Sequence, residues 1–289
     1  MEYSRSLMTV HAHPDDEVLY TGGILAKYSR EGARTVLVTC TLGQEGHPGD
    51  ISAPGNNIGE IRRAELIAAT KVLGVGKLHL LGYKDSGKGG TDANNHPACF
   101  SRADEREAVG RLVRLIRLER PDVLISYDEN GDYGHPDHIK AHRITVAAFY
   151  AAADSQAYPD ENSPWEVSKL YYCYWRPSMQ FKVMSMMSSD PGPSSQVLRT
   201  GRTLDQSRFQ DDPRAKTLVE VGEYVGIKIR ALKCHQSQLV GYERLMRLPQ
   251  SVLHEFAGTE CFVLAQCRVK GLSPGSFESD LFDGLQISR

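Results

Sequence analysis

The fold is decided by a stretch near the start of the chain, Leu7-Met8-Thr9-Val10-His11-Ala12-His13-Pro14-Asp15-Asp16-Glu17. Residues 7–12 are mostly apolar and predict a buried β-strand. Residues 13–17 are rich in side chains that bind metal ions, and a helical pattern over residues 20–31 follows them. A turn that carries metal-binding groups therefore lies between the first predicted strand and the first predicted helix.

Strand-like runs and helical patterns alternate along most of the chain. Strands are expected at residues 7–12, 34–40, 77–81, 122–127, 167–175 and 259–267. Helices are expected at residues 20–31, 59–73, 104–119, 221–237 and 242–256, and from a second polar motif to about Ala153. This alternation predicts an α/β fold with a Rossmann-like, doubly wound and mostly parallel sheet.

The second polar motif is His135-Pro136-Asp137-His138, and it follows the strand expected at 122–127. Right-handed crossovers place the strand-to-helix loops of such a sheet at its carboxyl edge. Both motifs are therefore expected at one edge, where they can form a composite site. The long polar loops at 43–59 and 82–103 are expected to be functional or mobile, because loops of this length are uncommon in compact domains.

The chain, residues 1–289, is expected to form one domain with three parts. An α/β core that carries the metal site spans residues 1–175. Residues 176–220 are expected to be an insertion or lid, because Met, Ser and Pro are frequent there and no period is clear. Residues 221–289 are expected to supply C-terminal helices and a strand.

Composition excludes several classes of function. The net charge of −2, with acidic and basic residues interspersed, gives no footprint for nucleic acid or an anionic membrane surface. No run approaches the roughly 18–20 apolar residues that span a bilayer, and the first residues lack a signal-peptide layout. Six scattered cysteines without a CxxC pair favour free thiols. We therefore expect a cytoplasmic protein.

The two motifs together contain the ligands of a hydrolytic zinc centre. Such centres usually take three ligands from His, Asp and Glu and leave one position for water. His13 and Asp16 are three residues apart at a strand end, and His138 is the expected third ligand. Two histidines and one carboxylate suit one Zn²⁺ ion, although Fe²⁺ uses the same set.

The neighbouring side chains are candidates for proton transfer and charge stabilisation. Consecutive side chains of an extended backbone point different ways, so Asp15 is expected to face the attacking water as a general base. His135 could stabilise an oxyanion or protonate the leaving amine, and Asp137 could orient it. Tyr133 is a further candidate oxyanion donor.

Each motif alone has a structural alternative. The first could be a helix entry capped by an aspartate, and the second a helix that begins at a proline and carries a surface histidine. The presence of both motifs at equivalent strand-to-helix turns of one sheet favours a metal site over these alternatives. The glycines at 43, 46 and 49 do not form a GxGxxG motif, which argues against a dinucleotide site, and neither a GxSxG motif nor a P-loop is present.

These motifs resemble the LmbE-like (PIG-L) family of zinc-dependent N-acetylglucosaminyl deacetylases. The resemblance is carried by residues 11–17, 38–46 and 127–138, and it extends over nearly the whole chain. Within the family the chain is most similar to the actinobacterial branch that acts in mycothiol metabolism. The stretches that carry this closer similarity are 85–92, 231–238 and 278–285.

The resemblance implies a hydrolase that removes the N-acetyl group from a small N-acetylated amino-sugar glycoside, such as N-acetylglucosaminyl-inositol. It implies one zinc ion bound by His13, Asp16 and His138, with Asp15 as base and with His135 and Tyr133 at the tetrahedral intermediate. It also implies that Arg62 and Asp85 bind sugar hydroxyls. No nucleic-acid or membrane partner is implied, and a homo-oligomer is left open.

Three residues depart from the family patterns. Related amidases of mycothiol S-conjugates have a lysine where this chain has Tyr20, and Gln44 and His47 replace acidic residues of the deacetylase loop. The chief alternative activity is therefore an amidase of thiol S-conjugates, which Tyr20 argues against. An alternative of another class is a sugar-binding protein without catalysis.

Overall fold

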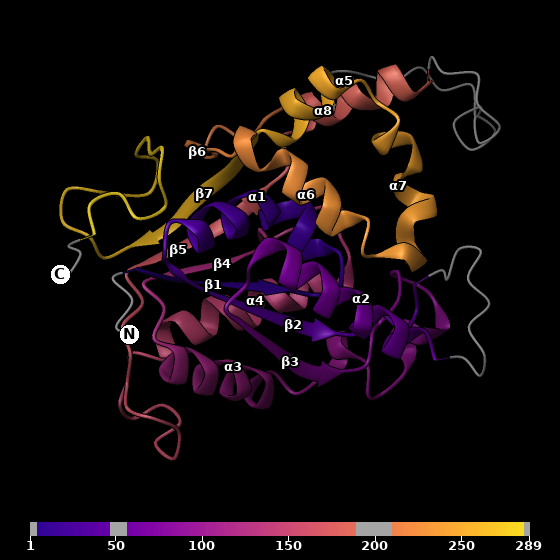
Figure 1. Ribbon diagram of the computed structural model, residues 1–289. Helices are drawn as coiled ribbons and strands as arrows, with labels where there is room; N and C mark the ends of the chain where they lie inside the picture. The colour runs from indigo at the N-terminus through magenta and orange to yellow at the C-terminus, as the bar shows by residue number, and fades with distance from the viewer. Residues whose placement is uncertain (1–4, 47–56, 189–209, 286–289) are drawn as a thin grey trace.

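The structure of the protein, a computed structural model, describes residues 5–46, 57–188 and 210–285 (Figure 1). Within these residues one mixed sheet forms in the order β3-β2-β1-β4-β5-β7-β6. Its strands are β1 (Ser6–His11), β2 (Arg34–Thr41), β3 (Lys77–Tyr83), β4 (Val123–Ser126), β5 (Lys169–Tyr174), β6 (Thr217–Glu220) and β7 (Thr259–Cys267). The first five are parallel, and β7 runs antiparallel to both β5 and β6. The predicted α/β class and mostly parallel sheet are confirmed.

Helices cover both faces of the parallel part of the sheet. The helices α1 (Asp16–Arg30) and α2 (Ile58–Leu73) pack against each other and against α6 (Val225–Leu232). The helices α3 (Glu105–Glu119) and α4 (Pro136–Ala151) form a separate contacting pair. Three further helices, α5 (Pro177–Ser188), α7 (Leu239–Met246) and α8 (Gln250–Ala257), lie towards the top and right of Figure 1.

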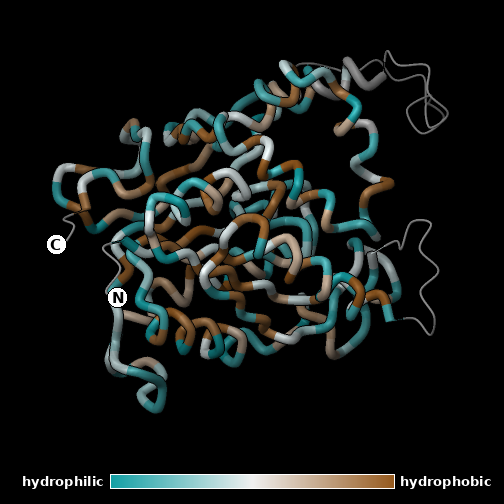
Figure 2. The backbone as a smooth tube through the Cα atoms, in the orientation of Figure 1, coloured by the Kyte–Doolittle hydropathy of each residue, from teal (hydrophilic) through white to brown (hydrophobic). Residues whose placement is uncertain are grey.

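Sequence pattern explains why these segments fold as they do. All six residues of β1 are buried, as expected for a central parallel strand covered on both faces. The helix α3 buries one apolar stripe that includes Val109, Leu112 and Ile116, and the Asp104 side chain accepts a hydrogen bond from the Glu107 N–H at its start. Figure 2 shows hydrophobic segments concentrated in the interior and hydrophilic ones on the outer loops.

The sheet order places the two motifs together. The strands β1 and β4 are hydrogen-bonded neighbours, although more than 100 residues of chain separate them in sequence order. The chain leaves β1 into α1 and leaves β4 towards α4, and these two helices belong to the two different helix groups. In doubly wound sheets, ligands bind beyond the carboxyl ends of the strands, at the place where two neighbouring strands lead to helices on opposite faces.

The structure differs from the sequence prediction at several boundaries. The helix α1 begins at Asp16 instead of residue 20, so the first motif runs directly into it. The region 176–220, expected to be an insertion or lid and assigned no helix or strand, contains α5 and β6, whereas residues 189–209 lie outside the described part. The helix expected at 242–256 is two helices, because Pro249 stands before α8. The division into core, lid and C-terminal part stays a prediction.

The C-terminal tail is fastened to the sheet by a buried ion pair. Lys169 of β5 and Glu278 are both fully buried, and Lys169 Nζ lies 2.5 Å from Glu278 Oε1. The same ammonium group donates a 2.6 Å hydrogen bond to the carbonyl oxygen of Asp283. The Tyr171 hydroxyl donates to Glu278 Oε2 over 2.8 Å. This network lets an irregular tail pack against the core without leaving a buried charge unpaired.

All six cysteines lie in the described residues and are free, as predicted. No helix among the described residues is long and apolar enough to cross a membrane.

Candidate active site

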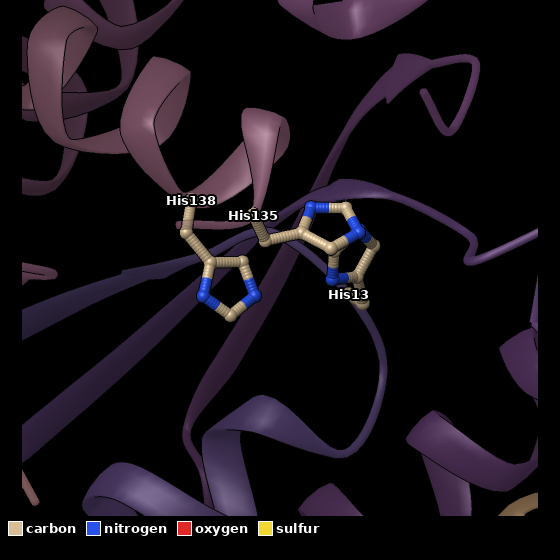
Figure 3. Close-up of side chains that lie close together, drawn as sticks. All are labelled: His13, His135 and His138. Atoms are coloured by element: carbon tan, nitrogen blue, oxygen red, sulfur yellow. The ribbon is translucent and has the colours of Figure 1, made fainter. Parts of the chain in front are cut away.

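The two motifs meet beyond the carboxyl ends of β1 and β4. Figure 3 shows the imidazole rings of His13, His135 and His138 grouped between the loop after β1 and the start of α4. The ring centroids are 4.6 Å apart for His13 and His135, and 5.3 Å apart for His13 and His138. Pro136 opens α4, as predicted, and His135 is its N-cap residue.

Asp16 lies between the two histidines that the sequence analysis pairs with it. Its Oδ2 atom is 3.3 Å from His13 Nδ1 and 3.5 Å from His138 Nε2. Ligand atoms at the corners of a tetrahedral zinc site, each about 2.0–2.1 Å from the metal, are about 3.4 Å from one another. The two separations that involve Asp16 therefore match a tetrahedral ion, and the His13 and His138 rings also belong, with His135, to a group whose nitrogen atoms lie within 4.8 Å of one another.

His138 provides an independent test of this fit. The residue is 1% exposed, and neither ring nitrogen has a hydrogen-bond partner. The Tyr127 ring stacks on it with 4.1 Å between centroids and an angle of 14° between the rings. A buried imidazole without hydrogen bonds is costly, and a metal ion at Nε2 would give that nitrogen a partner. Its neighbour Asp16 has a pKa well below the usual value, since the histidines beside it outweigh the effect of burial.

His13 is surrounded by carboxylates. Its Nε2 atom is 3.2 Å from Asp137 Oδ2 and 3.6 Å from Asp85 Oδ1. Although burial opposes protonation, Asp137, Asp16 and Asp85 together raise the pKa of His13 well above its ordinary value. The contact at Nε2 leaves Nδ1 directed to Asp16, the arrangement in which a carboxylate orients a metal-binding histidine.

The expected partner of Asp137 is therefore corrected. Sequence proximity predicts that its carboxylate orients His135, but in the structure the carboxylate contacts His13 and Ser86. The Ser86 N–H donates to Asp137 Oδ2 over 3.0 Å, and the Ser86 hydroxyl donates to Oδ1. Asp137 is the second residue of α4, its side chain contacts His13 and Ser86, and its backbone N–H donates to the ring of His135.

The hydrogen bond from the Asp137 backbone determines the tautomer of His135. Its Nδ1 atom accepts a hydrogen bond of 3.2 Å from the Asp137 N–H, so the neutral ring carries its proton on Nε2. Burial, followed by the charges of His13 and His138, lowers the pKa of His135 to about 4. A neutral imidazole that donates through Nε2 suits an oxyanion better than it suits protonation of an amine.

The backbone conformation of Asp15 gives its side chain contacts different from those of the proposed metal ligands. Its φ angle is 101°, a conformation that is rare for a non-glycine residue and costs about 1–3 kcal/mol. The expectation of an extended backbone at Asp15 is therefore wrong, although the side chains of Asp15 and Asp16 do make different contacts. The Tyr242 hydroxyl donates to Asp15 Oδ2 over 3.1 Å, and Arg62 Nη2 is 3.4 Å from Oδ1. Burial raises the pKa of Asp15 against the opposing charge of Arg62.

Arg62 and Asp85 line the site, and protein atoms already occupy most of their polar groups, although the buried Nε atom of Arg62 has no hydrogen-bond partner. Arg62 donates hydrogen bonds to the carbonyl oxygens of Gly43 and Pro14, over 2.8 and 2.5 Å. Asp85 accepts from the N–H groups of Glu45 and Gly87, and its pKa is lowered because these bonds and His13 outweigh burial. Both residues therefore shape the site, and their contact with sugar hydroxyls stays a prediction.

A cavity of about 820 Å³ opens in front of these groups. Its walls include charged or amide side chains beyond the two motifs, namely Glu45, Lys88, Asp92 and Gln238. Tyr133 lies at this cavity, 67% exposed, with its ring 5.3 Å from that of His138. Partial desolvation, followed by the nearby negative charge of Asp16, raises the pKa of Tyr133, so its hydroxyl remains a hydrogen-bond donor at neutral pH.

Further contacts, which the sequence pattern does not indicate, fix the residues of the two motifs. The Tyr127 hydroxyl donates to Asp16 Oδ2 over 2.7 Å, and Tyr242 reaches Asp15 from α7. Glu17 and His235 form a buried pair with 2.7 Å between Oε1 and Nε2. Two of these residues had a signal in the sequence, because Tyr127 ends the strand predicted at 122–127 and His235 lies in the stretch 231–238 that carries the closer resemblance.

Comparison with known proteins identifies the family. A family profile described as PIG-L, GlcNAc-PI de-N-acetylase, matches residues 8–149. A protein of Catenulispora acidiphila named 1D-myo-inositol 2-acetamido-2-deoxy-alpha-D-glucopyranoside deacetylase 1 is 37% identical over 298 residues, which cover 99% of this chain and 91% of the relative. The chain belongs to the PIG-L family. It is an enzyme of the deacetylase class, a hydrolase of amide bonds, in a family that depends on metal.

Solved structures share the fold of this PIG-L protein. The N,N'-diacetylchitobiose deacetylase of Pyrococcus horikoshii matches with a TM-score of 0.63 at 20% identity, over 94% of this chain and 84% of that one. The 4-carboxy-2-hydroxymuconate hydratase of Pseudomonas putida also has a TM-score of 0.63, at 18% identity, over 93% and 99%. Since a hydratase and a deacetylase share it, the fold alone does not determine the reaction, and the activity must be argued from the site.

Proposed function

We propose that this enzyme removes the N-acetyl group from N-acetylglucosaminyl-inositol or a closely similar amino-sugar glycoside, with one zinc ion per chain. The observation that carries the proposal is the division of labour between two adjacent aspartates. Asp16 faces His13 and His138, whereas Asp15 makes its contacts with Tyr242 and Arg62 and lines the cavity. Relatives named for the inositol glycoside support the substrate.

The proposed zinc ligands are His13, Asp16 and His138. Asp137 orients His13, and Tyr127 orients Asp16. A zinc ion bound there supplies a Lewis acid that polarises the acetyl carbonyl and acidifies a water molecule. The donor set also suits Fe²⁺, so metal analysis is part of the test.

The chain's own groups then carry the proton and the charge. Asp15 takes a proton from the attacking water, whose oxygen forms a bond to the acetyl carbon. Tyr133 and His135 donate hydrogen bonds to the carbonyl oxygen as it becomes negative. When the bond between carbon and nitrogen breaks, Asp15 returns its proton to the amine. The products are acetate and the free amino sugar.

The cavity supports a small substrate rich in hydroxyl groups. Its volume of about 820 Å³ falls within the usual range for small-molecule sites. Carboxylates, an ammonium group and an amide on its walls offer both acceptors and donors, which a polyol requires. We propose Asp85 and Arg62 as contacts of the sugar.

The proposed deacetylase activity can be measured directly as acetate release. The protein is stripped of metal, reloaded with zinc or Fe²⁺, and assayed with N-acetylglucosaminyl-inositol, N-acetylglucosaminyl-malate and free N-acetylglucosamine. We expect the glycosides to be hydrolysed and the activity to depend on metal. No acetate from any of them would refute the substrate class.

The same assay separates the two alternatives. A thiol S-conjugate in the panel tests the amidase. The Tyr20 hydroxyl is committed to Asp132, to which it donates over 2.5 Å, so it replaces the amidase lysine with a fixed neutral group. Metal bound at one per chain without hydrolysis of any substrate would favour a sugar-binding protein. The cytoplasmic location stays a prediction, tested by fractionation.

A further inference from the structure

The peptide unit that joins Pro14 and Asp15 is bound on both of its sides. Its carbonyl oxygen, on Pro14, accepts a hydrogen bond of 2.5 Å from Arg62 Nη2. Its N–H, on Asp15, donates a hydrogen bond of 2.9 Å to Glu17 Oε2. The orientation of this peptide helps to set the φ angle of Asp15 at 101°, a value that residues with a side chain rarely adopt. The two contacts therefore support this conformation.

The Glu17 carboxylate is itself fixed by a distant part of the chain. Glu17 and His235 are both fully buried, and His235 Nε2 is 2.7 Å from Glu17 Oε1. A buried carboxylate needs such a partner, because burying an unpaired charge is costly. His235 follows α6 and is 218 residues from Glu17 in sequence.

The segment that carries His235 is fastened to the core at a second point. The Ser237 N–H and hydroxyl each donate a 2.7 Å hydrogen bond to the buried carboxylate of Glu65 in α2. The position of the His235 ring is thus determined by α2 as well as by its own pairing with α1. The next helix, α7, carries Tyr242 to the carboxylate of Asp15.

We propose that Glu17 and His235 form a positioning pair that fixes the backbone of Asp15 and thereby directs its carboxylate at the attacking water. This inference rests on the proposed function, in which Asp15 is the general base. Neither Glu17 nor His235 is among the described residues that line the cavity. The pair therefore acts through Asp15 and not on the substrate. The C-terminal region is then part of the catalytic arrangement and not merely a cover.

The chain contains a matched control for this pair. Glu260 is also a buried glutamate that accepts hydrogen bonds from backbone N–H groups of α1, over 2.7 Å from Gly23 and 2.8 Å from Ile24. It is also paired with a cation of the C-terminal region, with 2.6 Å between Oε1 and Lys228 Nζ. Its contacts lie further along α1, away from Asp15. Loss of Glu260 should therefore affect stability in the same way and leave the base in place.

The first experiment compares Glu17→Ala with Glu260→Ala in the zinc-loaded enzyme. We expect Glu17→Ala to lower kcat by about 100-fold, the cost of misplacing a reacting group by about 1 Å, without changing KM or zinc content. Glu260→Ala should lower Tm but keep the wild-type kcat. Glu17→Gln should recover most of the activity, since its amide oxygen can still accept from the Asp15 N–H. Equal losses of kcat in the two alanine variants would overturn the inference.

The partner residue gives a second route if Glu17→Ala does not fold. His235→Ala should lower kcat with KM unchanged, and the double variant with Glu17→Ala, where it folds, should lose no more than Glu17→Ala alone, because the two act as one unit. Wild-type kcat in a folded His235→Ala enzyme would overturn the pairing.

A crystal structure of Glu17→Gln or His235→Ala provides a readout that does not depend on the substrate. Asp15 should leave its φ of 101° in His235→Ala and keep it in Glu17→Gln. An unchanged Asp15 in His235→Ala contradicts the inference even if the wild-type enzyme is active. An altered Asp15 supports it even if the substrate panel fails, so the two failures are distinguishable.

Discussion

The hydroxyl group of Tyr127 offers the sharpest test of how the metal ligands are placed. It donates a 2.7 Å hydrogen bond to Asp16 Oδ2 and accepts one of 2.8 Å from the Ala12 N–H. Tyr127 and Ala12 are both fully buried, so water cannot replace the lost oxygen. Tyr127→Phe removes this oxygen and keeps the ring that stacks on His138. The substitution therefore isolates the effect of one hydroxyl.

Two losses are expected from Tyr127→Phe, and each has a magnitude. The Ala12 N–H is left buried without a partner, which costs about 1–3 kcal/mol of unfolding free energy. At about 2–4 °C per kcal/mol for a large domain, Tm should fall by about 2–12 °C. Asp16 loses a donor that orients it, and loss of such a partner typically weakens metal binding by about 10–100-fold.

Thermal unfolding and a zinc titration against a competing chelator measure these two losses. Tyr171→Phe is the control, because it removes a buried hydroxyl that donates to Glu278 away from the site. It should lower Tm and leave zinc affinity unchanged. If folded Tyr127→Phe binds zinc as tightly as the wild type, then Tyr127 does not position Asp16, and the reasoning is refuted.

Three further predictions test the base, the metal and the tail. Asp15→Asn should lower kcat by about 10²–10⁴-fold with zinc content unchanged, and an active variant would exclude Asp15 as the base. Zinc at about 100 times its Kd should add about 2.7 kcal/mol to the unfolding free energy, and His138→Ala should abolish the gain in thermal unfolding. Lys169→Met leaves Glu278 buried and unpaired, so urea unfolding should show that the free energy of unfolding falls by about 3–5 kcal/mol. The kcat/KM of the folded enzyme should stay unchanged. An unchanged urea midpoint would contradict this account of the tail.

Sequence pattern was sufficient for most of the fold. The parallel strands are continuous apolar runs, and the helices have one apolar face, so periodicity identified both. It placed the start of α1 too late because residues 16–19 show no apolar stripe and Asp15 makes no side-chain capping hydrogen bond. The helix α5 lies in a Met-rich and Ser-rich segment without a clear period, and the strand β6 is only four residues long and pairs with β7 from a distant part of the chain, so sequence pattern revealed neither.

Sequence pattern was less informative about the site outside the two motifs. The motifs were identifiable because their residues are contiguous and topology brings β1 and β4 together. The partner of Asp137 was predicted wrongly, since a local argument favours the neighbour His135 and cannot see Ser86 across the sheet edge. The contacts of Tyr242 and His235 join residues more than 200 positions apart, and no local pattern records them.

The adjacent pair Asp15 and Asp16 shows how one short motif provides both a metal ligand and a base. Burial acts on both carboxyl groups, yet the pKa of Asp15 is raised, whereas histidines hold the pKa of Asp16 well below its ordinary value. Environments that push two pKa values apart are how active sites assign distinct roles to identical side chains. Here the separation depends on the backbone, because the left-handed φ of Asp15 sends its carboxylate to Tyr242 and Arg62 and leaves Asp16 with the histidines. An extended backbone would need no support from Glu17, so the distant contacts of the C-terminal region follow from the need for two roles within two residues.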